Sequence, residues 1–499
     1  MRTPITTDSE WTFDLLEAYS KEIHRIGKEY LGLDTYPNQI EIISAEQMLD
    51  LYSSVGLPIS YSHWSYGKEF VRNSQGYKQG HMGLAYEIVS NTSPCLVYCM
   101  EENTMCMQIL VMAHAGIGHN AFFKNNYMFK QWTDAESIVD YLVFAKKYIE
   151  ECEEKYGIDE VEETLDACHA LQSYGVDKYK RPSKISLVEE ELRQKERNDY
   201  LQAQVNDLWR TVPETKHHIE RRRKERFPTE PQENILYFIE KNAANLPTWK
   251  REIIRIVRKT SQYFYPQKQT KVINEGFATF THYLIMQKLH DENLVSDGFM
   301  LEFLASHTGV VRQPAFDEKY YSGINPYALG FAIFMDIKRV CENPTEEDKR
   351  WFPEMAGSDW KKTTQFAMKN FKDESFILQY LSPKVMRDLR LFSIKDLVDE
   401  DDYVVSAIHN DAGYRAVRTA LSKQYDLTTH EPTIQVFNVD RWGDRQLTLR
   451  HYMVNGRYLD GDSSKEVLKH IATLWGFTVR METVNEDGTI KAVFEVSTK

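Results

Sequence analysis

The chain has 499 residues, of which 42% are hydrophobic and 27% are charged, and its formal net charge is −13. This composition is typical of a globular protein with roughly two to four domains, and the negative charge argues against general binding to nucleic acids or anionic membranes, because both require a basic surface. The N-terminus lacks an apolar stretch and the sequence has no run of about 18 apolar residues, so we expect a cytoplasmic protein without a signal peptide or a membrane-spanning helix.

Helices and a short sheet are predicted in the first 120 residues. Apolar side chains at mixed three- and four-residue steps predict a helix over 9–31, and a second helix is expected over 44–54. Residues 80–89 look extended, and the apolar run 95–100 has the length and composition of a buried strand. We therefore expect a short sheet packed against the next helix, 104–119.

The predicted helix 104–119 carries polar residues that packing does not require. Its surface is nearly all apolar, yet His114 and His119 lie near its end, and Glu101 and Glu102 come just before it. Polar groups in a buried helix cost free energy unless they have partners. We therefore expect the functional site to lie beside this predicted helix.

The middle of the chain is predicted to be helical. A charged helical stretch leads into the basic run 216–226, for which a solvated connector, a docking patch for an acidic partner and a nucleic-acid contact are three alternative interpretations. Periodicity and cap signals predict helices over 133–155, 159–172, 186–209, 234–242, 247–264, 296–306, 325–341, 358–372 and 383–391.

The pattern changes after the acidic cluster 399–402. Alternating residues, hairpin signals such as Asn455-Gly456 and one short helix predict a small β-β-α-β-β module. The predicted fold class is α+β: a predominantly α-helical main domain, 1–398, with a short sheet beside a histidine-bearing helix and a charged helical insertion over about 130–230, followed by a C-terminal module, 399–499.

A zinc-type constellation is one interpretation of the polar residues. In the thermolysin-like zincins, an edge strand precedes a helix with two histidines, and a second helix supplies a glutamate in a context similar to Asn274-Glu275-Gly276. Three protein ligands with an open fourth position acidify a bound water. We predict that His114, His119 and Glu275 hold zinc or another divalent ion, which gives a zincin-like site.

Two departures from the zincin motif shape this prediction. The histidines are five residues apart instead of four, and five residues of a regular helix rotate by about 140°, which would separate the rings. Gly116 and Gly118 would permit a π-bulge or an early helix end that brings the rings together. Ala115 stands where the zincins have their catalytic glutamate, so the base would have to be Glu101 or Glu102.

Other interpretations of the same residues stay open. The two histidines can be hydrogen-bonded groups without a metal, or part of another polar ligand site, and Glu101 can be a satisfied carboxylate at a strand end. Cysteines in this region are expected to be reduced and packed in the core. Further candidates for the same cleft are His63, His282 and His307, and the pair Tyr86-Glu87 is expected to face the helix histidines across the sheet.

Long segments of the chain resemble the SpoVR (stage V sporulation protein R) family. The similarity is carried by AHAGIGHNAFFKNNYMF at 113–129, YFYPQKQTKVINEGFATFTHY at 263–283 and INPYALGFAIFMDIKR at 324–339, and it extends through 233–259, 357–360 and 370–384. The last 70 or so residues are similar to that family's C-terminal module. The resemblance runs nearly from end to end.

The resemblance implies a physiological setting and assigns no catalytic residues. It implies a role in spore cortex formation in spore formers and in stress or stationary-phase physiology in other bacteria, with a PrkA-type serine kinase and a companion with a von Willebrand-like domain as partners. Two functions follow as hypotheses. One is a metal-dependent hydrolase, and the other is a non-catalytic regulatory or scaffold protein that acts with the kinase.

Overall fold

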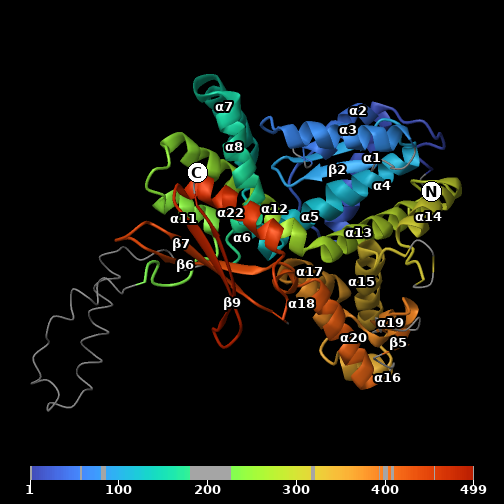
Figure 1. Ribbon diagram of the computed structural model, residues 1–499. Coiled ribbons are helices and arrows are strands. Elements are labelled where there is room, and N and C mark those ends of the chain that lie inside the picture. Colours follow the sequence, from blue (N-terminus) through green and yellow to red (C-terminus); the bar gives the residue numbers. More distant parts are fainter. Residues whose placement is uncertain are drawn as a thin grey trace, which may run out of the picture. The chain divides into compact units, whose positions relative to one another are not determined.

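The computed structural model describes residues 3–54, 56, 59–79, 86–179, 226–315, 318, 321–392, 394–396, 403–405, 410–454 and 456–497 (Figure 1). The charged stretch predicted over 186–226 lies outside the described residues except for Arg226, as do residues 80–85 and the predicted domain boundary at 399–402. No helix in the described ranges combines the length and hydrophobicity that crossing a bilayer requires.

The chain divides into two compact units, and each is built from two separate segments. Unit 1 comprises Met1–Glu162 and Gln262–Glu431, and unit 2 comprises Glu163–Ser261 and Pro432–Lys499. The α+β fold class is confirmed, because helices predominate in unit 1 and a strand-rich module ends the chain.

A three-stranded sheet lies at the N-terminal side of unit 1. Strands β1 (Asn38–Ile43), β2 (Glu87–Ser90) and β3 (Cys95–Met100) are arranged in the order β1-β3-β2. β1 pairs parallel to β3, and β2 pairs antiparallel to it with Glu87 opposite Cys99. The strand predicted at 95–100 is confirmed at the centre of the sheet.

Some of the helices around this sheet begin at a residue whose side chain caps the helix. Thr104, for example, accepts the backbone N–H of Met107 and caps the helix α4. The helices before residue 163 are α1 (Phe13–Arg25), the short π-helix η1 (Ile26–Tyr30), α2 (Ala45–Ser53), α3 (Trp64–Lys78), α4 (Met105–Ala113), the π-helix η2 (His114–His119), α5 (Asn120–Asn125), α6 (Tyr127–Trp132), α7 (Ile138–Tyr156) and the start of α8 (Ile158–Ala170).

The second segment of unit 1 adds a helical bundle built around α13 (Lys271–Asp291). This helix is buried on most sides and packs against α4, η2 and α15 (Pro326–Glu342); Figure 1 shows it running between α4 and α15. The other elements of this segment are the end of α12 (Thr248–Gln269), α14 (Asp297–Val310), α16 (Glu346–Trp351), α17 (Trp360–Asn370), α18 (Asp373–Tyr380), α19 (Pro383–Asp388), β4 (Ile394–Asp396), β5 (Tyr403–Val405), α20 (Asp411–Gln424) and α21 (Leu427–His430).

Unit 2 contains the predicted β-β-α-β-β module. Its sheet has the order β6-β7-β8-β9, with β7 and β8 parallel and joined through a crossover helix, α22. The elements are η3 (Gln172–Tyr174), α11 (Ile235–Asn242), β6 (Thr433–Val439), β7 (Leu447–Tyr452), α22 (Gly461–Trp475), β8 (Val479–Val484) and β9 (Ile490–Val496). The order of strands and helix agrees with the sequence prediction.

Candidate metal centre

A π-helix brings the two histidines of the central motif together. Residues His114–His119 form η2, and the N–H of Asn120 donates to the carbonyl of Ala115, five residues earlier. This wider winding places residues five apart on one face. The ring centroids of His114 and His119 lie 4.6 Å apart, as the glycine-permitted π-bulge predicted.

The π-helix is fixed from two sides. On one side, the Asn38 amide of β1 donates to the Gly116 carbonyl at 2.8 Å. On the other side, α13 approaches so closely that a Cβ on Gly118 would lie 2.6 Å from Cα of Ala278. A glycine is required at position 118 because any side chain would push α13 away. This close packing brings Glu275, on the preceding turn of α13, next to the histidines.

Three ligand-type atoms converge at this point. Oε2 of Glu275 lies 3.4 Å from Nε2 of His119 and 3.7 Å from Nε2 of His114. The three ligand atoms all lie within 4.8 Å of one another, and this is the one such group of three found among the described residues. The structure therefore brings together all three residues that the sequence predicts as metal ligands.

Glu275 is a carboxylate whose inward oxygen lacks a hydrogen bond. Its Oε2 atom is fully buried and has no hydrogen-bond partner, although the side chain as a whole is 19% exposed. Burial alone would raise the pKa of Glu275, but the histidines outweigh burial and lower the pKa below its usual value. Burial likewise favours neutral His119, yet Glu275 and the Asn274 amide raise the net pKa of His119. An ionised, unpartnered oxygen beside two imidazoles is what a cation site presents.

Partners on the far side of each imidazole set the direction of the rings. Nδ1 of His119 donates to Oδ1 of Asn274 at 2.9 Å, and its Nε2 faces Glu275. Nδ1 of His114 lies 2.9 Å from Nδ1 of His282, which in turn has His307 as its neighbour. Metal-binding histidines are oriented in this way by a group that accepts their other N–H.

The geometry fits a divalent ion that prefers nitrogen and oxygen. Zinc binds such atoms at about 2.0–2.2 Å, so tetrahedral ligand atoms lie roughly 3.4 Å apart. The separations of 3.4 and 3.7 Å between Oε2 of Glu275 and the two imidazole nitrogens are close to that value. With the unpartnered Oε2 atom, the donor set of two imidazoles and one carboxylate suits zinc or a similar metal.

A second carboxylate and a tyrosine border the group. Oε1 of Glu87 lies 3.9 Å from Nε2 of His114, and burial raises the pKa of Glu87. The ring of Tyr327 stacks on His114 with centroids 6.4 Å apart. Burial, followed by the charges of Glu275 and Glu87, raises the pKa of Tyr327 and keeps its hydroxyl protonated. Glu87 was named in the sequence only beside Tyr86, and no sequence signal indicated Tyr327.

The other predicted site residues lie outside this group. Glu101 and Glu102 are exposed in a turn after β3, where the Glu101 carbonyl accepts the Trp11 indole N–H. Tyr86 is 46% exposed. His63 is the N-cap of α3, and its Nδ1 accepts the N–H of Ser65. His282 and His307 are buried behind His114 instead of facing the ligand atoms.

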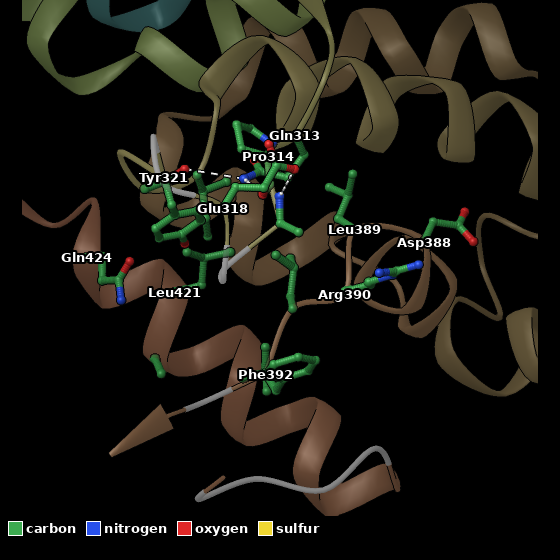
Figure 2. Close-up of a pocket in the computed structure, with 16 residues that line it drawn as sticks. Gln313, Pro314, Glu318, Tyr321, Asp388, Leu389, Arg390, Phe392, Leu421 and Gln424 are labelled. Atoms are coloured by element: carbon green, nitrogen blue, oxygen red, sulfur yellow. Dashed lines mark hydrogen bonds between the residues drawn. The ribbon is translucent and has the colours of Figure 1, made fainter. Parts of the chain in front are cut away.

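A separate pocket lies elsewhere in unit 1 (Figure 2). It has a volume of about 710 Å³ and is lined by residues such as Tyr321, Arg390 and Leu421. Its acids are engaged locally: Glu318 accepts the N–H of Ala315, and Asp388 pairs with Lys384. Among the described residues, the one group of three ligand-type side chains is His114, His119 and Glu275, and none of these lines the pocket.

The start of α13 is held by a buried acid, which predicts a pH effect on stability. Asp373 is 1% exposed and accepts the N–H groups of Val272 and Ile273, and burial raises its pKa from 3.8 to about 7. A carboxyl whose pKa is raised in the folded state stabilises the fold below its unfolded pKa and loses that contribution as the pH rises.

We therefore expect the stability of the wild type to fall, relative to Asp373→Asn, between about pH 4 and pH 7. The difference should be at most roughly 4 kcal/mol. Urea unfolding of both proteins across this range measures it. An unchanged difference in unfolding free energy would contradict the raised pKa.

Comparison with known proteins agrees with the resemblance noted in the sequence. The chain is 62% identical over 490 residues to the uncharacterized protein YcgB of Escherichia coli (strain K12), and the match covers 98% of this chain and 96% of that protein. Residues 10–430 match the family described as SpoVR like protein, and residues 432–486 match the SpoVR-like C-terminal domain. No solved structure matches the chain. The chain therefore belongs to the SpoVR family.

Proposed function

We propose that this protein is a cytoplasmic metal-dependent hydrolase whose ion is held by His114, His119 and Glu275. The observation that supports the proposal most directly is the buried, unpartnered Oε2 atom of Glu275 at 3.4 and 3.7 Å from two imidazole nitrogens. A divalent ion with three protein ligands supplies Lewis acidity and lowers the pKa of water at its open position.

Glu87 is our candidate for the general base in place of Glu101 or Glu102. It borders the ligand group, whereas the two sequence-predicted acids are exposed away from it. Burial raises the pKa of Glu87, and a general base works best when its pKa lies near the operating pH. Tyr327, which keeps its proton and stacks on His114, would donate a hydrogen bond to developing negative charge.

The substrate class follows from the chemistry and the family setting together. A carboxylate base beside a Lewis acid suits hydrolysis of an amide bond. Because the family is linked with spore cortex formation and stress physiology, we propose a cell-wall precursor or a protein as the substrate. The family's association with a PrkA-type serine kinase and a von Willebrand-like companion belongs to the same physiological setting.

Metal content of the purified protein tests the proposal. We expect about one zinc or other divalent ion per chain in the wild type, and less than a tenth of that in His114→Ala and His119→Ala. His290→Ala is the matched control, because His290 lies on α13 but pairs with Asp297 at the surface and should leave the metal content unchanged.

A wild type with no stoichiometric metal would remove the basis of the hydrolase. It would favour the alternative, a regulatory or scaffold protein acting with the kinase. That alternative also predicts that Glu275→Gln leaves the cellular phenotype intact.

A further inference from the structure

Three histidines form a hydrogen-bonded row that begins at the metal centre. Nδ1 of His114 lies 2.9 Å from Nδ1 of His282, and Nε2 of His282 lies 3.1 Å from Nδ1 of His307. The three rings come from η2, α13 and α14, and each residue is at most 5% exposed. Metal-binding histidines usually donate their other N–H to a carboxylate, a backbone carbonyl or water, so an imidazole in that position is unusual.

His282 is the middle ring and uses both of its nitrogens in the row. Each of the two nitrogen–nitrogen contacts holds one proton, because one imidazole nitrogen must donate and the other must accept. Aromatic rings also surround His307, with Phe331 and Tyr283 at centroid distances of 4.9 and 5.1 Å. A neutral imidazole has one donor nitrogen and one acceptor nitrogen, so every hydrogen bond in the row must point the same way.

A row of this kind has two arrangements, and the group at His114 Nε2 selects between them. Without a metal, a proton on Nε2 of His114 faces the carboxylates of Glu275 and Glu87, so His114 accepts from His282 and His282 accepts from His307. With a metal on Nε2, the proton must be on Nδ1 of His114, which now donates to His282, and His282 donates to His307.

We infer that metal binding reverses the hydrogen bonds of this row and thereby signals at α14 whether the centre is occupied. The inference rests on the proposed metal centre and adds a means of regulating it. At the far end, His307 contacts His282 through Nδ1, so its Nε2 is the last nitrogen of the row, on a residue that is 5% exposed. That nitrogen is an acceptor when the centre is empty and a donor when it is filled.

The tautomers can be read directly in the wild-type protein labelled with ¹⁵N-histidine. Long-range ¹H–¹⁵N spectra distinguish a protonated Nδ1 from a protonated Nε2. Between the metal-free and the zinc-loaded protein, we expect the protonated nitrogen to change from Nε2 to Nδ1 at His114, and from Nδ1 to Nε2 at both His282 and His307. His290, at the surface end of α13, should not respond to zinc and serves as the internal control.

Two substitutions of His282, the middle ring, distinguish its support of the ligand His114 from its transmission of the hydrogen-bond reversal to His307. In His282→Asn, Oδ1 can take the place of Nδ1 and accept from His114, but nothing reaches His307. We expect this variant to bind zinc with nearly wild-type affinity, and the tautomer of His307 to stay the same when zinc is added. His282→Phe removes both contacts and should weaken zinc binding by about 10- to 100-fold, as loss of an outer partner does.

The outcomes distinguish this inference from the proposed function. If zinc binds but the tautomer of His307 stays the same, or if the metal-free rings are imidazolium ions at neutral pH, the reversal is wrong while the metal centre stands. If the wild type takes up no zinc or other divalent ion at all, the proposed function fails, and the inference fails with it. Because the first measurement needs no substitution, a variant that does not fold cannot hide either result.

Discussion

Glu275→Gln is expected to abolish stoichiometric metal binding. The amide keeps the shape of the side chain but removes the negative charge of Oε2, the atom within 3.4 and 3.7 Å of the two imidazoles. The loss in zinc affinity should exceed the 10- to 100-fold that removal of an outer partner costs. Competition with a chromophoric chelator measures the dissociation constant of both proteins.

The pH dependence of zinc binding provides a second test of the Glu275→Gln substitution. Glu275 raises the pKa of His119, and a protonated ring cannot bind a metal. In the wild type, zinc affinity should therefore rise with pH until the pH exceeds this raised pKa. In Glu275→Gln the pKa of His119 falls, so the remaining weak binding should level off at a lower pH.

Glu87→Gln is the matched control for the loss of charge. Glu87 borders the same imidazole at 3.9 Å but lies outside the group of three ligand atoms. We expect it to keep zinc affinity within about tenfold of the wild type, which is the lower end of the cost of an outer partner. If Glu87→Gln loses the metal and Glu275→Gln keeps it, the ligand assignment is wrong.

The proximity of the three candidate ligands could be predicted because it depends on local backbone winding and chain order. Two glycines between His114 and His119 indicated that a regular helix would not continue, and the π-helix η2 confirms this. Glu275 was predicted from the order of strand and helices along the chain. The seven-residue step from Glu275 to His282 argued against joint ligation of one ion, because two turns of helix separate them, and His282 lies behind His114.

The sequence alone could not identify Glu87 as the acid beside the three candidate ligands. The register of β2 against β3 determines which residue of β2 faces the site. Glu101 and Glu102 are close to the histidines in sequence, but a turn after β3 exposes them. Glu87 reaches the site through pairing of β2 with β3, where it lies opposite Cys99. Successive strand residues point to opposite faces, so a shift by one residue would have placed its neighbour there instead.

Gly330→Ala is expected to disrupt the packing that positions Glu275. Gly330 of α15 meets Gly276 of α13, and a Cβ on Gly330 would lie 2.2 Å from the carbonyl oxygen of Val272 and 2.7 Å from Cα of Gly276. These are backbone atoms, so no side chain can rotate away, and the two helices must separate. We expect a loss of about 3 kcal/mol or more in the free energy of unfolding.

The same substitution should weaken metal binding without touching a ligand. Gly276 directly follows Glu275, so a displacement of α13 at this crossing moves the carboxylate relative to η2, against which α13 also packs at Gly118. An error of about 1 Å is comparable to half a metal–ligand bond length and is not tolerated by a three-ligand site. Zinc content after dialysis, measured below the unfolding temperature of the variant, tests this expectation.

Gly309→Ala separates close packing from the general effect of replacing a helical glycine. Gly309 lies in α14, and a Cβ there would meet no atom within 4 Å. Alanine at an open helical position should raise stability by about 0.5–1 kcal/mol, since glycine loses more backbone entropy on folding. Gly330→Ala carries the same entropic gain, so its net loss must come from the helix crossing. If both substitutions stabilise the protein, α13 and α15 are not in the contact that holds Glu275 beside the histidines.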